Sequence, residues 1–214
     1  MIEEGSFTAI LTKDEIKRLL EEKKLIIDPI LDEEEQIHDV SIDLRLDTRI
    51  ILLKPIAIGN IDPLEQIRLP EYTEQIELDP CQDKLILHPK SLVLGQTLEY
   101  VKLPGNIYGV LDGRSSLARL GIIVHATASS IDPNYEGHIS FEIINLGPTP
   151  VILYPLVRVA RLTLYKLSKP LSKTIKHKYD YSTKPHPSKI TEDSDLQIIR
   201  RLRQKFGDIM KLNL

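Results

Sequence analysis

The 214 residues carry 28 Lys and Arg against 31 Asp and Glu, a formal net charge of −3, so nucleic-acid binding through bulk phosphate attraction is not expected. A single cysteine, Cys81, excludes an intrachain disulfide and any metal site built on several thiolates, and it favours a cytoplasmic setting. The sequence has no run of about 18 apolar residues, and the acidic start MIEEGSF is unlike a signal peptide, so neither membrane insertion nor export is expected.

The first predicted element is a helix over residues 13–23. Thr12 and Glu15 form a capping-box pattern, and apolar residues follow at helical spacing. Residues 38–53 then alternate Val40, Ile42 and Leu44 with Ser41, Asp43 and Arg45. That period predicts a half-buried strand whose polar face meets solvent.

Further strands are predicted along the middle of the chain, each short, β-branched and bounded by Pro, Gly or Asn. They cover residues 84–88, 92–102, 107–111, 121–126, 138–145, 150–154 and 157–166. Many short strands at this spacing predict a mainly β domain with a few helices, of barrel or jelly-roll type. Residues 55–80 carry scattered Pro and acidic groups and are interpreted as a long connection or insertion.

The C-terminal part changes in composition. Residues 168–191 are Lys-rich and punctuated by Pro, which indicates an extended arm or a solvated linker after a β domain over 1–167. Residues 192–214 place Leu196, Ile199, Leu202, Phe206 and Met210 on one stripe, which predicts an amphipathic helix. Its basic face is compatible with nucleic acid or lipid, but a packed helix with a solvated charged face is favoured.

The segment Asp112–Asn145 holds the chemistry-bearing residues. Gly113 and Gly121 bracket an Arg-Ser-Ser-Leu-Ala-Arg run that predicts a turn leading into a short helix. Backbone N–H groups, two hydroxyls and two guanidinium groups there can converge on phosphates, a set that suits a triphosphate. The alternative is an ordinary capped surface helix.

Glu142 lies in HISFEIIN, where Ile139, Phe141 and Ile143 share one strand face and Ser140, Glu142 and Ile144 share the other. We interpret it as an inward-facing carboxylate. A buried carboxylate must be paired or protonated, as a general acid/base requires, whereas the alternative is a strand Glu on a wet face. His125, on an apolar stretch, is a candidate of second rank, because such a histidine is more often a satisfied core residue.

The order GRSSLAR (113–119), VHATA (124–128), IDP (131–133) and the strand around Glu142 resembles the dCTP deaminase branch of the trimeric dUTPase superfamily. The resemblance extends upstream through DVSIDLRL and LHPKSLVLGQTLEYVKLP. It implies a distorted β-barrel or jelly-roll of the dUTPase-like type and a homotrimer with shared active sites. It also implies Mg²⁺ bound with the substrate triphosphate, with no metal ligands from protein side chains.

The resemblance also implies roles for individual residues. Glu142 takes a proton from the water that attacks C4 of cytosine, and Ser115 orients that water. The remaining substrate-binding residues are Arg114, Ser116 and Arg119 for phosphate, Thr127, Ala128 and Ile131 for the exocyclic amine, Asp132 and Tyr135 for the sugar, and Lys178 and Tyr179 from the C-terminal segment that folds over the triphosphate. This chain has Ser182 where the family often carries Gln.

The leading functional hypothesis is zinc-independent hydrolytic deamination of dCTP to dUTP and ammonia, a reaction of pyrimidine deoxynucleotide metabolism. The H-x-E and P-C-x-x-C signature of zinc deaminases is missing from the sequence. Two alternatives stay open: a dUTP pyrophosphatase or bifunctional enzyme giving dUMP, and a non-catalytic nucleotide-binding regulator. Ser129-Ser130 matches neither the His-Arg of monofunctional enzymes nor the Gly and aromatic residue of bifunctional ones. Expected ligands are dCTP, dUTP and dTTP-type nucleotides, without nucleic-acid or membrane partners.

Overall fold

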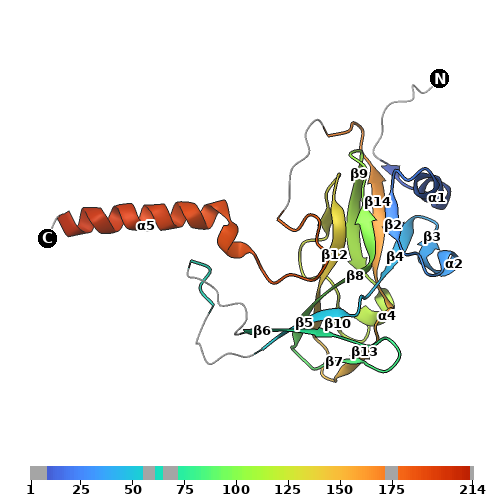
Figure 1. Cartoon of the computed structure of the whole chain (residues 1–214), viewed down its shortest axis with the longest axis horizontal. Coiled ribbons are helices and arrows are strands. Elements are labelled where there is room, and N and C mark those ends of the chain that lie inside the picture. The colour runs from blue at the N-terminus through green and yellow to red at the C-terminus, as the bar shows by residue number, and fades with distance from the viewer. Residues whose placement is uncertain (1–8, 55–60, 65–71, 172–177, 213–214) are drawn as a thin grey trace. The chain divides into compact units, whose positions relative to one another are not determined.

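The computed structural model of the chain describes residues 9–54, 61–64, 72–171 and 178–212, and the side chains up to residue 206 (Figure 1). Contacts divide the chain into two compact units. The first comprises Met1–Leu53 with Gln75–His186, and the second comprises Lys54–Glu74 with Pro187–Leu214.

The first unit is built on two six-stranded sheets. One has the order β11-β9-β14-β4-β3, with β1 also paired to β14; the other has the order β10-β12-β8-β5-β6, with β2 also paired to β8. The strands of the first sheet are β1 (Ala9–Ile10), β3 (Ile37–His38), β4 (Ser41–Arg45), β9 (Ile107–Gly113), β11 (Ser130–Ile131) and β14 (Arg158–Lys166). Those of the second are β2 (Ile26–Asp28), β5 (Arg49–Leu53), β6 (Thr73–Glu77), β8 (Leu92–Lys102), β10 (Ile122–Ile123) and β12 (Glu136–Asn145), and β7 (Leu85–Leu87) pairs with β13 (Val151–Leu153). The prediction of a mainly β chain with few helices is confirmed.

The predicted N-terminal helix is α1 (Lys13–Glu21), two residues shorter than expected. Its capping box is complete, because the backbone N–H of Thr12 donates to Glu15 Oε2 over 3.0 Å and the N–H of Glu15 donates to Thr12 Oγ1 over 3.5 Å. The helix ends before Lys23, whose φ of 53° lies in the left-handed region.

The single strand predicted over residues 38–53 is wrong in two respects. The segment forms three strands, and β4 and β5 belong to different sheets. The supposed solvent face of β4 is buried as well, since Ser41 is 3% exposed and Asp43 is 0% exposed. Alternation between apolar and polar residues shows that two faces differ, but it does not show that the polar face meets water.

The strand predicted over residues 121–126 is reduced to β10, which pairs with the end of β12. Gly121 has φ of 85°, and a Cβ atom there would lie 2.5 Å from the backbone nitrogen of Gly147, so the chain turns closely at this point. The insertion predicted over residues 55–80 contains β6, and residues 55–60 and 65–71 lie outside the described residues.

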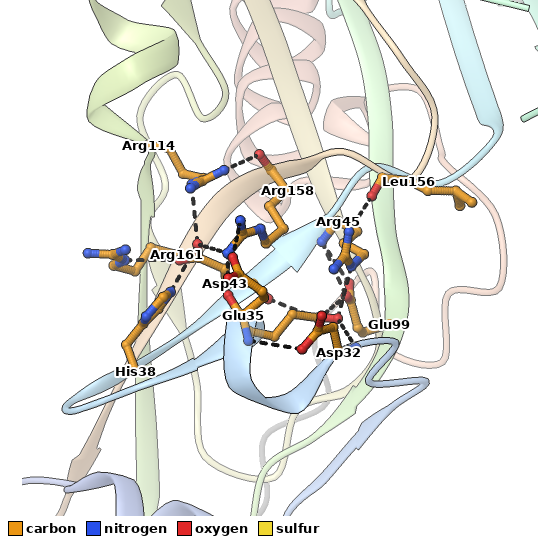
Figure 2. A network of polar contacts seen from close by, with 11 residues as sticks. Asp32, Glu35, His38, Asp43, Arg45, Glu99, Arg114, Leu156, Arg158 and Arg161 are labelled. Carbon is orange, nitrogen blue, oxygen red and sulfur yellow. Dashed lines mark hydrogen bonds and ion pairs between the residues drawn. The ribbon is translucent and has the colours of Figure 1, made fainter.

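A buried polar network joins the short helix α2 (Glu33–Gln36) to β4 and β8 (Figure 2). Glu99, 0% exposed, accepts hydrogen bonds from the backbone N–H of Arg45 over 2.9 Å and from Gln36 Nε2 over 2.9 Å. Burial raises the pKa of Glu99 to about 7, against the opposing effect of these hydrogen bonds. Gln36 Oε1 accepts from Arg45 Nε over 2.9 Å, so the network fixes α2 beside β4.

The second unit contains a 3₁₀ turn (Ile190–Glu192) and α5 (Ser194–Leu212), which agrees with the amphipathic helix predicted over 192–214. Arg200 donates to the carbonyl oxygen of Leu64 through Nε over 3.0 Å and through Nη2 over 2.9 Å. Apolar residues of α5 are exposed, among them Ile198, Leu202 and Phe206. Within the described part of the chain, no helix is both long and apolar enough to cross a membrane.

Candidate active site

The predicted phosphate turn follows the end of β9. Arg114 has extended backbone angles, φ −83° and ψ 133°, and the four-residue helix α4 (Ser115–Ala118) begins after it. Ser115, Ser116 and Arg119 are exposed, while Leu117 packs against the core. The predicted turn into a short helix is present, and it presents two hydroxyls and the Arg119 guanidinium group to solvent on an anchored segment.

Arg114 is held from three directions. Its Nε lies 3.2 Å from Asp43 Oδ2, and its Nη1 donates to the carbonyl oxygen of Arg158 over 3.2 Å (Figure 2). Its backbone N–H donates to the carbonyl oxygen of Val159 over 3.3 Å. These contacts fix the side chain before any ligand binds, which lowers the entropic cost of gripping a phosphate.

Glu142 lies on the face of β12 opposite the core residues Phe141 and Ile143, as the alternation predicted. It is not inward-facing, however, because 36% of its side chain is exposed. The half-buried position arises because β12 is covered on one face by the core and only partly on the other. The carboxylate is therefore accessible to a substrate from the surface.

His125 is the partner of Glu142. Its Nδ1 lies 3.1 Å from Glu142 Oε2, and only 9% of the histidine side chain is exposed. Contact with the Glu142 carboxylate raises the pKa of His125 above its ordinary value, against the effect of burial. Asp112, two residues before Arg114, adds a smaller electrostatic contribution in the same direction. The end of β9 and the His125–Glu142 pair are thus within electrostatic reach of each other.

The predicted base- and sugar-binding residues lie on the segment before β12. Thr127 and Ala128 are exposed, and Ile131 is buried on β11, where it pairs with Gly109. The Asp132–Tyr135 segment forms a turn, because the N–H of Tyr135 donates to the carbonyl oxygen of Asp132 over 3.1 Å.

Tyr135 is tied to the strand that follows it. Its hydroxyl donates to the carbonyl oxygen of His138 over 2.8 Å, and burial raises the pKa of the phenol. The hydroxyl of Tyr135 is therefore used in a hydrogen bond within the protein, and the ring is the part of the side chain available to contact a sugar.

The arm packs on the beginning of β12 after residues 172–177, which lie outside the described residues. Tyr181 N–H donates to the carbonyl oxygen of Glu136 over 2.6 Å, and His138 N–H donates to that of Ser182 over 3.0 Å. Ser182 is 3% exposed. Lys178 and Tyr179 are exposed just before this docking point, so the arm presents both on the surface.

The structure brings some predicted residues together and not others. Arg114, Ser115, Ser116 and Arg119 share one turn, whereas Glu142 is on a strand of the other sheet. Within the described residues, no hydrogen bond joins Ser115 to Glu142. The predicted role of Ser115, to orient a water for Glu142, needs no direct contact between the two residues and stays a prediction.

Asp43, Arg158 and Arg161 were not among the site residues predicted from the sequence, and His125 was given second rank without its partner Glu142. The sequence held one sign of this cluster. Asp43 lies on the strand predicted over 38–53, and Arg158 and Arg161, three residues apart, lie on the strand predicted over 157–166. Nothing in the sequence showed that these strands pair. No group of three or more His, Cys, Asp or Glu residues that would suit a metal ion is found among the described residues.

The family model for dCTP deaminase-like proteins matches residues 10–167. A relative from Methanosphaera stadtmanae named "dCTP deaminase, dUMP-forming" is 42% identical over 194 residues, which cover 88% of this chain and 97% of the relative. A Dictyoglomus thermophilum protein of the same name is 45% identical over 161 residues, covering 75% of this chain and 82% of its own. A Natronomonas pharaonis protein named "dCTP deaminase" is 37% identical over 190 residues, covering 87% and 97%.

Among solved structures, the 2′-deoxycytidine 5′-triphosphate deaminase from Agrobacterium tumefaciens aligns with a TM-score of 0.59 and 21% sequence identity. The alignment covers 74% of this chain and 47% of that longer chain. At this identity the likeness concerns the fold, and it confirms the fold expected from the resemblance.

Proposed function

The chain belongs to the dCTP deaminase-like family, and from this premise we propose that it hydrolyses dCTP to dUTP and ammonia, acting on the C4–N bond of the cytosine ring without zinc. The observation that carries the proposal is the His125–Glu142 pair, in which a half-exposed carboxylate has one oxygen 3.1 Å from a nearly buried imidazole. General acid/base catalysis requires a carboxylate that is held in place and open to water, and Glu142 meets both conditions.

In the proposed reaction, Glu142 accepts a proton from water as the water oxygen bonds to C4. The carboxyl group then passes that proton to N3, which gives a tetrahedral intermediate. The second proton of the former water goes through Glu142 to the amine, the C4–N bond breaks, and ammonia leaves as C4 becomes a carbonyl. Within the described residues Glu142 Oε1 accepts no hydrogen bond, and that oxygen is therefore the one assigned to water.

The substrate in this proposal is the magnesium complex of dCTP, whose phosphates lie at Arg114, Ser116 and Arg119. The guanidinium groups supply paired donors to phosphate oxygens, and the fixed Arg114 favours one orientation of the chain of phosphates. In this proposal Ser115 orients the attacking water, and each active site is formed by residues from two subunits of a homotrimer. Ser115 lies on α4 and Glu142 on β12, and among the described residues no hydrogen bond joins them, which is consistent with a site shared between two subunits.

A second candidate product is dUMP. Relatives at 42% and 45% identity carry the name "dCTP deaminase, dUMP-forming", which favours a coupled loss of pyrophosphate. The two products require the same first step at C4, so the residues assigned above serve both.

One time course tests these proposals. Purified protein is incubated with dCTP and Mg²⁺, the nucleotides are separated by anion-exchange chromatography, and ammonia and pyrophosphate are measured in parallel. Ammonia with dUTP supports simple deamination, and ammonia with pyrophosphate and dUMP supports the coupled reaction. Unchanged dCTP, with dCTP still bound, would instead support a nucleotide-binding regulator.

A further inference from the structure

Asp43 is a fully buried carboxylate enclosed by basic side chains (Figure 2). The groups that face it are Arg161 Nε at 3.0 Å from Oδ1, and His38 Nε2 at 3.1 Å, Arg114 Nε at 3.2 Å and Arg158 Nη1 at 3.6 Å from Oδ2. They come from β3, β14 and the turn after β9, so the cluster exists only in the folded chain. A buried carboxylate can be tolerated in this place because it is paired with so many cations.

Arg158 differs from the other two arginines because it has a second acidic partner. Its Nη2 lies 2.7 Å from Glu35 Oε2, and its Nη1 donates to the carbonyl oxygen of Glu35. Three guanidinium groups are therefore paired with two carboxylates. With Glu35 assigned to Arg158, Arg114 and Arg161 share the single charge of Asp43.

Arg161 is the most open of the three. Its side chain is 45% exposed, against 26% for Arg114 and 20% for Arg158. Asp43 holds it through Nε, and within the described residues no hydrogen bond engages its Nη1 or Nη2. A guanidinium group fixed at Nε and open at both Nη atoms is prepared to bind a further anion.

Strand pairing places Arg161 beside the phosphate turn. In the β14–β9 ladder Arg161 is opposite Asp112, and Ala160 is opposite Gly113, directly before Arg114. No ion pair joins Arg161 to Asp112 in the described part of the chain, so its partner there is Asp43. Arg114 and Arg161 are thus fixed on the same carboxylate, Arg161 on β14 and Arg114 directly after the neighbouring strand β9.

We infer that Arg161 is a further substrate-binding residue, which contacts the terminal phosphates of the nucleotide, and that Asp43 is the positioning residue that orients Arg114 and Arg161 toward them. The inference rests on the proposed function, because it takes the nucleotide to lie at the Arg114–Arg119 turn. The excess positive charge suits a polyphosphate better than a monophosphate, so this subsite makes the enzyme select triphosphates.

The first test uses Arg161→Gln, with Arg18→Gln on α1 as a matched control that also removes one positive charge. Inorganic tripolyphosphate is titrated into each full-length protein by calorimetry, and the KM and kcat for dCTP are measured. Loss of one charge-assisted contact should weaken tripolyphosphate binding and raise the KM by about 10- to 100-fold, with kcat nearly unchanged. The control should match the wild type.

Asp43→Asn tests the positioning role. It should raise the KM for dCTP while kcat is retained, a split that general loss of structure would not produce. Should this variant fail to fold, Arg161→Lys replaces it: the charge remains, but the Nε contact with Asp43 is lost, and tripolyphosphate binding should fall between those of the wild type and Arg161→Gln.

The outcomes separate this inference from the proposed function. If the wild type binds tripolyphosphate through Arg161 but does not convert dCTP, the proposed function is overturned and the phosphate-binding role of Arg161 is supported. If the wild type deaminates dCTP and Arg161→Gln has the same KM and the same affinity for tripolyphosphate, the proposed role of Arg161 is overturned and the proposed function stands. Absence of tripolyphosphate binding by the wild type would overturn that role as well.

Discussion

Nδ1 of His125 lies 3.1 Å from Oε2 of Glu142, and this contact joins a histidine after β10 to a carboxylate in the middle of β12. Contact with this carboxylate raises the pKa of His125. The pair is therefore strongest below the ordinary histidine pKa of about 6.5 and weakens as the pH rises through the raised value. A protonated His125 holds Oε2 of the carboxylate on which the proposed chemistry depends.

The pair predicts a pH effect on activity. The kcat/KM for dCTP should rise as the pH passes above the raised pKa of His125, because loss of the imidazole proton frees Glu142 to accept one from water. His125→Asn keeps a donor near the Nδ1 position and does not titrate, so this rise should disappear. Rates measured across pH for both proteins check it, and an unchanged rise in the variant would assign it to another group.

Glu142→Gln should abolish turnover without abolishing binding. Removal of a general acid/base typically lowers a rate by about 10²- to 10⁴-fold, whereas the amide keeps the size of the side chain. Glu136→Gln is the matched control, since Glu136 lies on the same strand but pairs with Lys102 over 2.9 Å. Single-turnover assays and dCTP titrations compare the two variants. Retained activity in Glu142→Gln would show that another group is the base.

Gly137→Ala should release the arm from β12. Gly137 has φ of 149°, and an added Cβ would lie 2.9 Å from the backbone nitrogen of Ser182. A strained backbone of this kind costs about 1–3 kcal/mol, which is enough to undock the segment around Ser182. Limited proteolysis should then cut the arm faster than in the wild type. Gly113→Ala, where no atom lies within 4 Å of the added Cβ, should leave the cleavage rate unchanged.

Glu99 predicts a pH dependence of stability. Its pKa is raised to about 7 in the folded chain, against 4.5 for the model group, so the folded state retains a proton that the unfolded state loses. The free energy of unfolding should therefore fall as the pH rises from 4.5 to about 7, by at most about 3 kcal/mol from this group. Glu99→Gln should flatten that fall in urea titrations at several pH values. Equal slopes would rule out Glu99 as the source.

Shared active sites predict complementation between two inactive variants. When Ser115→Ala and Glu142→Gln chains are co-expressed, a site drawn from two subunits sometimes receives both wild-type residues. In a cyclic trimer with random mixing, about one quarter of the sites should be complete. The deaminase activity of the mixture should reach that share of the wild-type value. Activity no greater than the sum of the two separate variants would place both residues within one subunit.

Several features followed from the sequence because their causes are local. The Thr12 and Glu15 capping box is set by residues three apart, and α1 formed where it was predicted. The phosphate turn likewise depends on consecutive residues from Gly113 to Arg119. The alternation in β12 correctly separated Phe141 from Glu142, since successive strand side chains point to opposite faces.

The electrostatic environment of the site did not follow from the sequence. Asp43 was expected at a solvent face, yet it is buried by Arg114, Arg158 and Arg161, which are 71 or more residues away along the chain. His125 received its role only when the turn after β10 brought it to Glu142. Charged pairs of this kind depend on which strands become neighbours, a property that periodicity along one strand does not contain.

By itself the sequence determined a mainly β chain, a turn suited to phosphate, a carboxylate on the strand face opposite the core residues and the family to which these residues point. The tertiary structure alone decided that Glu142 is paired with His125, that Asp43 holds both Arg114 and Arg161, and that the arm packs on β12 at Gly137. The physical reason is that propensity and alternation act over a few residues. Pairing, burial and proton affinity are set instead by groups that only strand pairing brings within hydrogen-bonding distance.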